Sequence, residues 1–256
     1  MLENPVKRKL KAGTAVTGLW IAIGDPMVVE MLAQQGWDWL VVDTEHNPID
    51  LLTMTTMFQA IGRFQTAPML RIPEISELGI KRPLDAGAWG FVAPNVKTRE
   101  EAQLVADFGQ YPPQGKRSLG SGRYAASFKT DPQTYFKKAN EEILRIVQIE
   151  HVEGVRNIDA IFSVPGIDAC YIGPNDLCAS MNLAPSLEPP HKEFEEAVQT
   201  ILRAAKKHGV APGIHCAKPE TVNRRIAEGW RFVGCASDMS HLLGATRLSR
   251  DIIKTD

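Results

Sequence analysis

The segment GWDWLVVDTEHNPID, residues 36–50, has the pattern of a helix end, a strand and the start of the next helix. Gly36 suits the end of a helix, and Asp50 suits the N-cap of the next one. Between them, residues 39–43 form a run that is apolar up to its last residue, as in a strand covered on both faces of a parallel sheet. Three titratable residues close this run or follow it: Asp43, Glu45 and His46. The segment therefore predicts a buried parallel strand that ends in polar side chains.

Short apolar runs of the same kind recur along the whole chain, each closed by polar or turn residues. There are eight: GLWIAI (18–23), WLVVD (39–43), PMLRI (68–72), GFVAP (90–94), LRIVQIE (144–150), ACYIGP (169–174), VAPGIH (210–215) and RFVGCA (231–236). Helical segments lie between them. Asp25, followed by proline, suits a helix start, and Thr98 and Glu101 fit a capping box. Residues 191–207 have apolar residues at helical spacing.

Eight alternating βα units predict an α/β fold, the (β/α)8 TIM barrel, because right-handed crossovers leave few competing topologies. The chain of 256 residues suits a single domain, residues 1–256, since barrels of this length commonly have one core. Residues 110–140 are too long for a plain connection, and we expect them to form an excursion with a functional role.

The composition excludes several classes of protein. A net charge of -1 and a basic run confined to residues 7–11 argue against nucleic-acid binding. No stretch approaches the roughly 20 apolar residues of a membrane span, and no apolar segment follows the early lysines as in a signal peptide. The four cysteines lack CxxC spacing, which suits reduced thiols. We expect a cytoplasmic protein with neither nucleic-acid nor membrane partners.

The carboxyl ends of the strands are where the catalytic groups of a (β/α)8 barrel lie. Polar residues gather there: Asp43, Glu45 and His46 after the second run, Arg71 in the third, Gln148 and Glu150 in the fifth, and Asn175 and Asp176 after the sixth. The two-residue period of a strand places Gln148 and Glu150 on one face. If that face points inward, Glu150 stands at the mouth of the barrel.

Glu150 and Asp176 are the predicted metal ligands. Neighbouring strands lie roughly 4.8 Å apart, so carboxylates at adjacent strand ends can share one ion. Without a cation, their repulsion would raise one pKa. A few oxygen ligands suit Mg²⁺ or Mn²⁺, with Co²⁺ as a further option, and leave positions for water and substrate. No HxH pair or cysteine cluster suggests zinc.

The same set of residues suits proton abstraction next to a carbonyl group. A metal that chelates a 2-oxoacid polarises its keto oxygen and acidifies the adjacent carbon. Arg71 would add positive charge where an enolate oxygen develops. His46 would carry the proton, since its ordinary pKa lies near neutrality, and Asp43 would orient it or hold its charge. The expected reaction makes or breaks a carbon–carbon bond.

Each of these residues also has a purely structural interpretation. A single carboxylate is more often a helix cap or an ion-pair partner than a ligand, and Arg71 could simply pair with Asp43 or Glu45. His46 could lie in a turn before the next helix. The segment GSGRYA, residues 120–125, superficially fits a dinucleotide fingerprint, but no apolar strand leads into it, and we reject that interpretation.

At these residues the sequence resembles the HpcH/HpaI aldolase family, metal-dependent class II pyruvate aldolases with a (β/α)8 barrel. The matching stretches cover most of the chain in the expected order: GWDWLVVDTEH (36–46), LRIP (70–73), LDAGAWGFVAPNV (84–96), YPPQGKRS (111–118), QIE (148–150) and GIDACYIGPNDL (166–177). The resemblance implies reversible cleavage of a 4-hydroxy-2-oxoacid, through a metal-bound enolate, to an aldehyde and pyruvate or a related 2-oxoacid such as hydroxypyruvate.

The resemblance also implies roles for individual residues. The metal ligands would be Glu150 and Asp176, and the catalytic residues would be His46, Arg71 and Asp43. The substrate-binding residues would be Trp20, Arg71, Gln148, Gly173, Pro174 and Asn175. Family members are commonly hexamers, trimers of dimers, whose C-terminal helix packs on a neighbouring subunit. This implies such a contact for the apolar residues of the tail: Leu242, Leu243, Leu248, Ile252 and Ile253.

Four positions depart from the family pattern. Cys178 stands where serine or threonine is usual, and His151 stands where threonine is usual. His215 and Cys216, at the end of the seventh run, are more polar than the aliphatic residues expected there. None of them belongs to the predicted metal and enolate machinery. They do, however, leave the aldehyde preference open.

Three other functions stay open from the sequence. A Schiff-base aldolase needs a lysine at a strand end, whereas Lys97 and Lys218 fall only in the following loops. An acyl-CoA lyase of the citramalyl or malyl type would reuse the carboxylates and also need a basic groove, for which the candidates are Lys116, Arg117 and Arg123. A non-catalytic binding barrel would use the carboxylates only to hold an ion.

Overall fold

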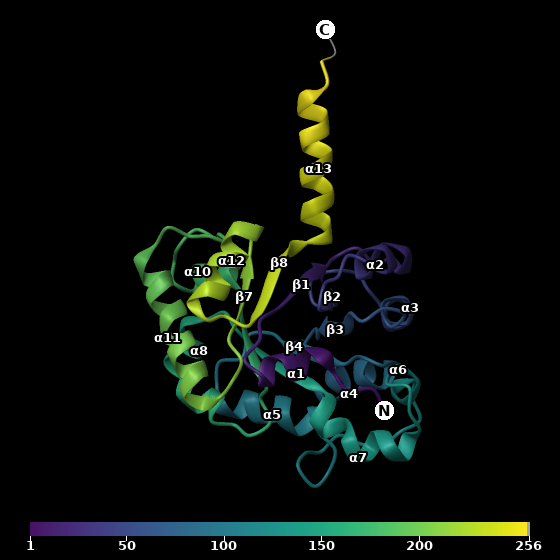
Figure 1. Cartoon of the computed structure of the whole chain (residues 1–256). Coiled ribbons are helices and arrows are strands. Elements are labelled where there is room, and N and C mark those ends of the chain that lie inside the picture. Colours follow the sequence, from purple (N-terminus) through teal and green to yellow (C-terminus); the bar gives the residue numbers. More distant parts are fainter. Residues whose placement is uncertain (255–256) are drawn as a thin grey trace.

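The computed structural model describes residues 1–254 and forms a closed barrel of eight parallel strands in sequence order (Figure 1). The strands are β1 (Val16–Ile21), β2 (Trp39–Asp43), β3 (Ala67–Arg71), β4 (Gly90–Ala93), β5 (Leu144–Ile149), β6 (Ala169–Ile172), β7 (Gly213–Cys216) and β8 (Phe232–Ser237). Strand β8 pairs with β1 and closes the barrel. The predicted (β/α)8 barrel is confirmed, and each predicted strand overlaps an observed one.

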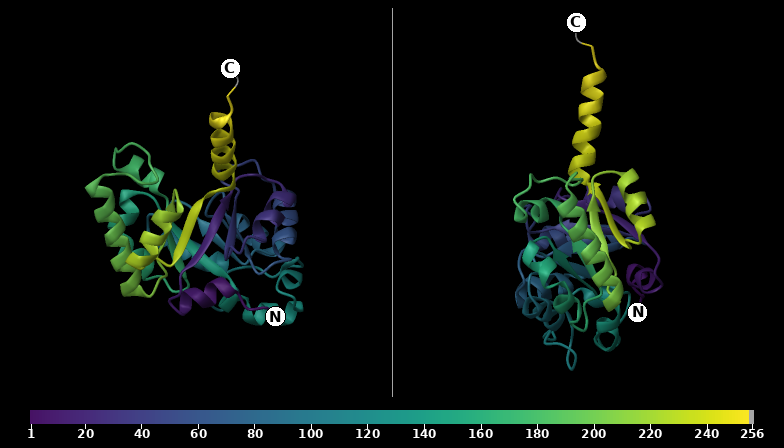
Figure 2. Two further views of the ribbon diagram at one scale, coloured as in Figure 1. Left: turned by 45° about the horizontal axis from the view of Figure 1, so that its top comes forward. Right: turned by 90° about the vertical axis from the view of Figure 1, so that its left-hand side faces the viewer.

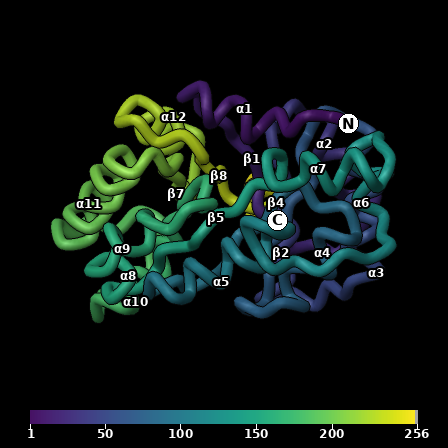
Figure 3. Tube along the Cα trace, turned by 90° about the horizontal axis from the view of Figure 1, so that it is seen from below, coloured from purple at the N-terminus to yellow at the C-terminus, as the bar shows by residue number. Residues whose placement is uncertain are grey.

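Helices connect the strands and surround the barrel (Figures 1 and 3). They are α1 (Pro5–Lys11), α2 (Pro26–Ala33), α3 (Leu51–Ile61), α4 (Glu77–Ala86), α5 (Arg99–Gly109), α6 (Tyr124–Ser127), α7 (Pro132–Glu142), α8 (Val152–Arg156), α9 (Ile158–Phe162), α10 (Pro174–Ser180), α11 (Lys192–His208), α12 (Pro219–Glu228) and α13 (Asp238–Ile252). Asp25 caps α2 as predicted, and Thr98 and Glu101 form the capping box of α5. Across residues 1–254, no helix has the length and apolar character needed to cross a membrane.

Helix α1 covers the end of the barrel at which the strands begin. The Asn4 side chain donates to the carbonyl of Trp89 at 2.9 Å, and the buried Lys7 ammonium donates to the carbonyl of Ile143 at 2.7 Å. Lys7 Nζ also pairs with Asp168 at 2.9 Å. These contacts fix α1 beneath the starts of β4, β5 and β6, at the end opposite the carboxyl termini of the strands.

Residues 110–140 pack against α4 of the same chain. The buried Arg117 guanidinium pairs with Asp85 at 2.8 Å and lies 4.5 Å from the ring centroid of Tyr111. Arg123 donates to the carbonyl of Ala86 at 3.1 Å. These contacts give the segment a structural role, and its predicted role at the functional site stays a prediction.

Helix α13 projects away from the barrel, starting where β8 ends (Figures 1 and 2). Its first residue, Asp238, is buried and accepts hydrogen bonds from the N–H groups of Ala22 and Ile23 at 2.8 and 3.0 Å. Residues 239–254 are all exposed in this chain, including the predicted contact residues Leu242, Leu243, Leu248, Ile252 and Ile253. The helix is therefore fastened to the barrel only at its first turn.

The four cysteines are free, as predicted, and all are buried. Burial raises the pKa of the Cys170 and Cys216 thiols to about 12. Because the thiolate is the reactive form, these two side chains behave as small apolar groups of the core.

Candidate active site

Two neighbouring cavities lie at the carboxyl ends of the strands. The central cavity, about 350 Å³, is lined among others by Trp20, Asp43, His46, Arg71, Gln148, Tyr171, Gly173, Pro174, Asn175, Asp176 and His215. The lateral cavity, about 310 Å³, is lined among others by Glu45, His46, Asn95, Glu150, His151 and Asp176. His46 and Asp176 line both. The structure thus brings every residue predicted for the site to one rim of the barrel.

Arg71 is the anchored cation of the central cavity. Asp43 and Arg71 are register partners on β2 and β3, and Arg71 donates to both Asp43 oxygens, from Nε at 2.9 Å and from Nη2 at 2.8 Å. Nη1 pairs with Glu45 at 3.0 Å, and the guanidinium carbon lies 5.3 Å from the ring centroid of Trp20. Burial alone would lower the pKa of Arg71, but the hydrogen bonds and charge of Asp43, with help from Glu45, raise it. Arg71 is therefore a permanent, fixed positive charge.

Within residues 1–254, no hydrogen bond or ion pair joins His46 to Asp43, so the predicted role of Asp43 toward the imidazole stays a prediction. Besides Arg71, the Asp43 carboxylate accepts from the Asn47 side chain at 2.8 Å and from the Glu45 N–H at 3.2 Å. The carboxylate near the imidazole is that of Glu45, 3.8 Å from His46 Nε2. The His46 side chain is 62% exposed, so it can meet solvent and ligands at the junction of the two cavities. In this geometry, Asp43 holds Arg71, and Glu45 is the neighbour of His46.

Glu150 is a buried carboxyl group at the end of β5. Its Oε1 accepts from the N–H of Asn95 at 2.8 Å, and its Oε2 accepts from Gln148 Nε2 at 2.5 Å. Burial raises the pKa of Glu150 to about 7, and the charge of Asp176 adds to the increase. A carboxylate in this position gains from a nearby cation, because a cation would offset both burial and repulsion.

Gly173 leaves the space that the Glu150 carboxyl group fills. A Cβ atom at Gly173 would overlap Glu150 Oε2 and crowd Gln148 Nε2. Gly173 also precedes α10, in which Asp176 lies in the first turn. A glycine between β6 and α10 therefore brings the two predicted ligands to the same place.

The residues of the lateral cavity fit a hard divalent cation. Glu150 and Asp176 both line it, and Asp176 is exposed there. Gln148, which lines the adjoining central cavity, has a buried Oε1 atom with no hydrogen-bond partner within residues 1–254. Oxygen donors of this kind suit Mg²⁺ or Mn²⁺ better than zinc. The described chain contains no cluster of three or more histidine, cysteine, aspartate or glutamate side chains arranged for a metal.

Tyr171 and His215 form a polar pair that the sequence did not place in the site. The Tyr171 hydroxyl lies 2.9 Å from His215 Nδ1, and the Tyr171 ring stacks on Trp20 at 4.9 Å. Burial raises the pKa of Tyr171 well above its ordinary value. Burial lowers the pKa of His215 to about 4, and the charge of Arg71 adds to this decrease. Both side chains are therefore neutral at pH 7. The unusual polarity of His215 was the available signal.

The other departures from the family pattern lie around the site without joining its charged groups. His151 lines the lateral cavity and caps α8, accepting from the Glu153 N–H at 3.1 Å. Cys178 is buried in α10, where its thiol approaches the carbonyl of Ser186 at 3.9 Å. Both have structural roles in this chain.

Comparison with known proteins identifies relatives over nearly the whole chain. The family model described as HpcH/HpaI aldolase/citrate lyase matches residues 16–245. The 5-keto-4-deoxy-D-glucarate aldolase of Escherichia coli (strain K12) is 35% identical over 254 residues, covering 99% of this chain and 98% of the relative.

Solved structures give the same result. An HpcH/HpaI aldolase/citrate lyase family protein from Burkholderia cenocepacia J2315 superposes with a TM-score of 0.90 at 32% identity, covering 97% of this chain and 98% of the other. The HpcH/HpaI aldolase from Desulfitobacterium hafniense DCB-2 superposes with a TM-score of 0.91 at 29% identity, covering 98% and 96%. Fold and sequence therefore point to the same family.

Proposed function

The chain belongs to the HpcH/HpaI aldolase/citrate lyase family and is a carbon–carbon lyase, and we propose that it is a divalent-metal-dependent pyruvate aldolase. It would reversibly cleave a 4-hydroxy-2-oxoacid to an aldehyde and pyruvate, or a related 2-oxoacid such as hydroxypyruvate. The 5-keto-4-deoxy-D-glucarate named for the relatives is itself a 4-hydroxy-2-oxoacid when its carbons are numbered from the keto end. It is therefore the first substrate to test.

One observation carries the proposal: two carboxylates and an anchored arginine line adjoining cavities at one rim of the barrel. Glu150 and Asp176 line the lateral cavity, and Arg71 lines the central one. A 2-oxoacid has a carboxylate and a keto oxygen that require positive charge. Arg71 provides one such charge, and a cation held by the two carboxylates would provide the second.

Glu150 and Asp176 would hold the metal, Mg²⁺ or Mn²⁺, with Co²⁺ as a further option. When bound, the metal would supply the Lewis acidity that polarises the keto group. Arg71 would bind the keto oxygen and stabilise the negative charge that develops there. Asp43 keeps the guanidinium in place through its two hydrogen bonds, so the charge is oriented before the substrate arrives.

His46 would move the proton at C3 of the 2-oxoacid. In the condensation direction it would accept this proton, directly or through a water molecule, while C3 bonds to the aldehyde carbon and the aldehyde oxygen takes up a proton. Cleavage reverses these steps. The Glu45 carboxylate lies 3.8 Å from Nε2 of His46. Trp20, Gln148 and the segment Gly173, Pro174 and Asn175 would form the walls of the substrate site.

The direct test is a panel of aldehydes incubated with pyruvate and either Mg²⁺ or Mn²⁺, with and without a chelator. We expect aldol products that disappear with the chelator and return with added metal. Product formation that survives chelation and stops after borohydride treatment with pyruvate would instead indicate a Schiff-base aldolase.

Variants separate the roles of the site residues. Glu150→Gln and Asp176→Asn should lose metal binding and activity together, because each removes a charged ligand. His46→Ala should still bind metal but lose most of the proton exchange at C3 of pyruvate. Asp159→Asn is a matched control, since Asp159 is an exposed acid paired with Lys207 at 2.8 Å. Unchanged exchange in His46→Ala would remove His46 from the mechanism.

The acyl-CoA lyase alternative needs a basic groove, and each of the three residues considered for it has a partner within the chain. Arg117 is buried and paired with Asp85, and Lys116 pairs with Asp107 at 2.6 Å. Arg123 is held by the carbonyl of Ala86. A non-catalytic barrel would bind metal and pyruvate in calorimetry without exchanging the C3 protons of pyruvate. The exchange assay therefore distinguishes such a barrel from the proposed aldolase.

We also propose that the enzyme is a homo-oligomer in which α13 packs on a second subunit, as in a hexamer. An isolated helix with this much exposed apolar surface is unusual for a monomer. Light scattering after gel filtration tests the oligomeric state. The four free cysteines suit a reducing compartment such as the cytoplasm.

A further inference from the structure

The Tyr171–His215 pair depends on a glycine in the next strand. Tyr171 belongs to β6, His215 to β7 and Gly234 to β8, and His215 and Gly234 are register partners. A Cβ atom at Gly234 would collide with the Tyr171 hydroxyl and lie 3.2 Å from His215 Nδ1. Three adjacent strands therefore combine to place this hydrogen bond under the central cavity.

The hydrogen bond defines which nitrogen of His215 carries the proton. Within residues 1–254, His215 Nδ1 is the only hydrogen-bond partner found for the buried Tyr171 hydroxyl. If His215 donated from Nδ1, the hydroxyl proton would be left without an acceptor, which is costly for a buried group. We therefore assign the proton of this hydrogen bond to Tyr171, with Nδ1 of His215 as the acceptor. A neutral imidazole that accepts at Nδ1 carries its proton on Nε2.

His215 lies beside the groups proposed to bind the 2-oxoacid. Its ring is edge-on to Trp20, with the centroids 5.9 Å apart, and the Arg71 guanidinium lies 5.3 Å from the same Trp20 ring. In the described chain, Nε2 of His215 has no hydrogen-bond partner. An uncharged donor thus lines the central cavity close to Arg71.

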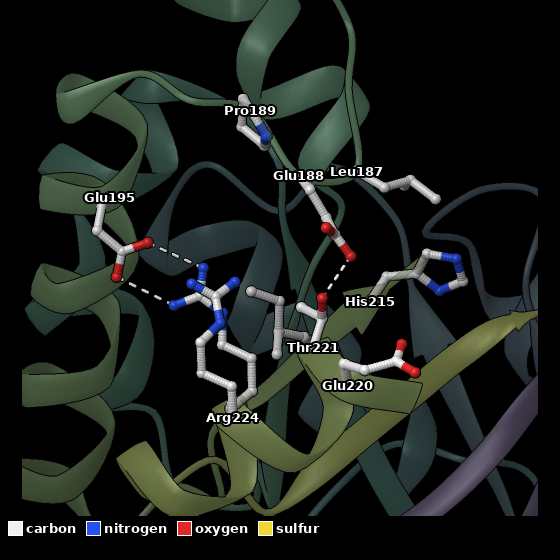
Figure 4. Close-up of a pocket in the computed structure, with 10 residues that line it drawn as sticks. Leu187, Glu188, Pro189, Glu195, His215, Glu220, Thr221 and Arg224 are labelled. Carbon is white, nitrogen blue, oxygen red and sulfur yellow. Dashed lines mark hydrogen bonds and ion pairs between the residues drawn. The ribbon is translucent and has the colours of Figure 1, made fainter. Parts of the chain in front are cut away.

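His215 also separates the central cavity from a third one. This outer cavity, about 410 Å³, lies between β7, α11 and α12, and its lining includes Glu188, Glu220, Thr221 and Arg224 (Figure 4). His215 and Leu187 line both the outer and the central cavity. The imidazole lies on the side away from Arg224 and Glu195 (Figure 4). A substrate in the central cavity therefore meets His215 beside Trp20 and Tyr171, and not the charged side chains of the outer cavity.

We infer that His215 is a specificity-determining residue whose Nε2–H donates a hydrogen bond to an additional hydroxyl or carboxylate oxygen of the substrate. This inference rests on the proposed aldolase function. The oxygen could belong to the 2-oxoacid, as in hydroxypyruvate, or to the aldehyde, as in glycolaldehyde or glyoxylate. Either source presents the same acceptor, so the experiment needs one arm for each.

The test compares oxygenated with deoxygenated substrates. One arm uses hydroxypyruvate against pyruvate with a fixed aldehyde, and the other uses glycolaldehyde against acetaldehyde with a fixed 2-oxoacid. The measured quantity is the ratio of kcat/KM values within each arm. His215→Leu removes the donor and should lower this ratio by about tenfold in one arm, as expected for one hydrogen bond. The affected arm identifies the source of the oxygen.

Two conservative variants distinguish substrate recognition from support of Tyr171. His215→Gln can place an amide donor near the position of Nε2, whereas His215→Asn places its amide near Nδ1 and restores only the contact with Tyr171. In the affected arm, we expect the kcat/KM ratio of His215→Gln to be closer to that of the wild type than the ratio of His215→Asn. The midpoint temperature of thermal unfolding should be higher for His215→Asn than for His215→Gln if the contact with Tyr171 stabilises the fold.

The outcomes separate this inference from the proposed function. If the wild type is active and both ratios stay within twofold in all His215 variants, His215 only supports Tyr171 and the inference is wrong. If the wild type forms no aldol product in either arm and does not cleave 5-keto-4-deoxy-D-glucarate, the proposed function fails. In that case, calorimetric titration with hydroxypyruvate and pyruvate in the presence of Mg²⁺ still tests the donor. The same titration with glycolaldehyde and acetaldehyde covers the aldehyde, and equal affinity differences in the wild type and His215→Leu for both pairs would then refute its role.

Discussion

Replacing Asp43 by asparagine should loosen Arg71 more than it affects His46. Asp43 accepts two hydrogen bonds from Arg71, at 2.9 and 2.8 Å, and both side chains are buried. Breaking such a pair costs about 3–5 kcal/mol, because the remaining charge stays buried without its partner. Glu45 lies 3.0 Å from Arg71 Nη1 and asparagine keeps one acceptor oxygen, so we expect a smaller loss of about 2 kcal/mol.

Urea denaturation at pH 7.5, followed by tryptophan fluorescence, measures this loss of unfolding free energy. The matched control is Glu45→Gln, which removes a partner that is 23% exposed and should cost less than about 1 kcal/mol. Steady-state kinetics supply the second measurement. Because Arg71 would bind the keto oxygen, Asp43→Asn should also raise KM for the 2-oxoacid, whereas metal affinity should change little.

The opposite pattern would refute this account of Asp43. If Asp43→Asn unfolds within 0.5 kcal/mol of the wild type, the pair with Arg71 contributes little. If it also shifts the pH dependence of C3 proton exchange as substitutions at His46 do, Asp43 serves the imidazole, as the sequence first indicated. A double-mutant cycle between Asp43 and Arg71 measures their coupling directly.

Three further predictions address packing, pH and assembly. Gly173→Ala should push the Glu150 carboxyl group aside and weaken Mg²⁺ binding, measured by calorimetry, at least tenfold. The folded-state pKa of His215, about 4, lies below the ordinary 6.5, so its contribution to stability is complete above pH 6.5 and is lost as pH falls toward 4. Between pH 7.5 and 5, the wild type should lose about 2 kcal/mol more than His215→Gln in urea denaturation. Leu243→Asp on α13 should shift the particle mass in light scattering toward the monomer, and an unchanged mass would refute the role of α13.

The strands could be predicted because each is buried on both faces and therefore reads as a continuous apolar run. Strand β2 was predicted with both ends correct, since Gly36 and Asp43 bound it clearly. Strand β7 was placed too early, at residues 210–215. The reason is that the approach to β7 is also apolar, although Ala211 forms only an isolated bridge to Ala169.

The position of the site followed from topology, but the pairing of its side chains did not. Asp43 and Glu45 are two residues apart, and either could have faced His46. The choice depends on the register of β2 against β3, which places Asp43 beside Arg71. Register is a property of two strands together, so a local stretch of sequence does not contain it.

The hydrogen bond between Tyr171 and His215 could not be predicted from a local stretch of sequence either. A tyrosine in β6 and a glycine in β8 are each unremarkable, and the histidine in β7 stands out only by its polarity, while Tyr171 and His215 are 44 positions apart. The barrel makes them neighbours, and each then depends on the other two, because the buried hydroxyl needs the imidazole and both need the space over Gly234. A substitution at any one of the three residues therefore changes the hydrogen bond or the packing of the other two. The substrate preference that we infer for His215 is therefore a property of the set Tyr171, His215 and Gly234, and variants should be compared within that set.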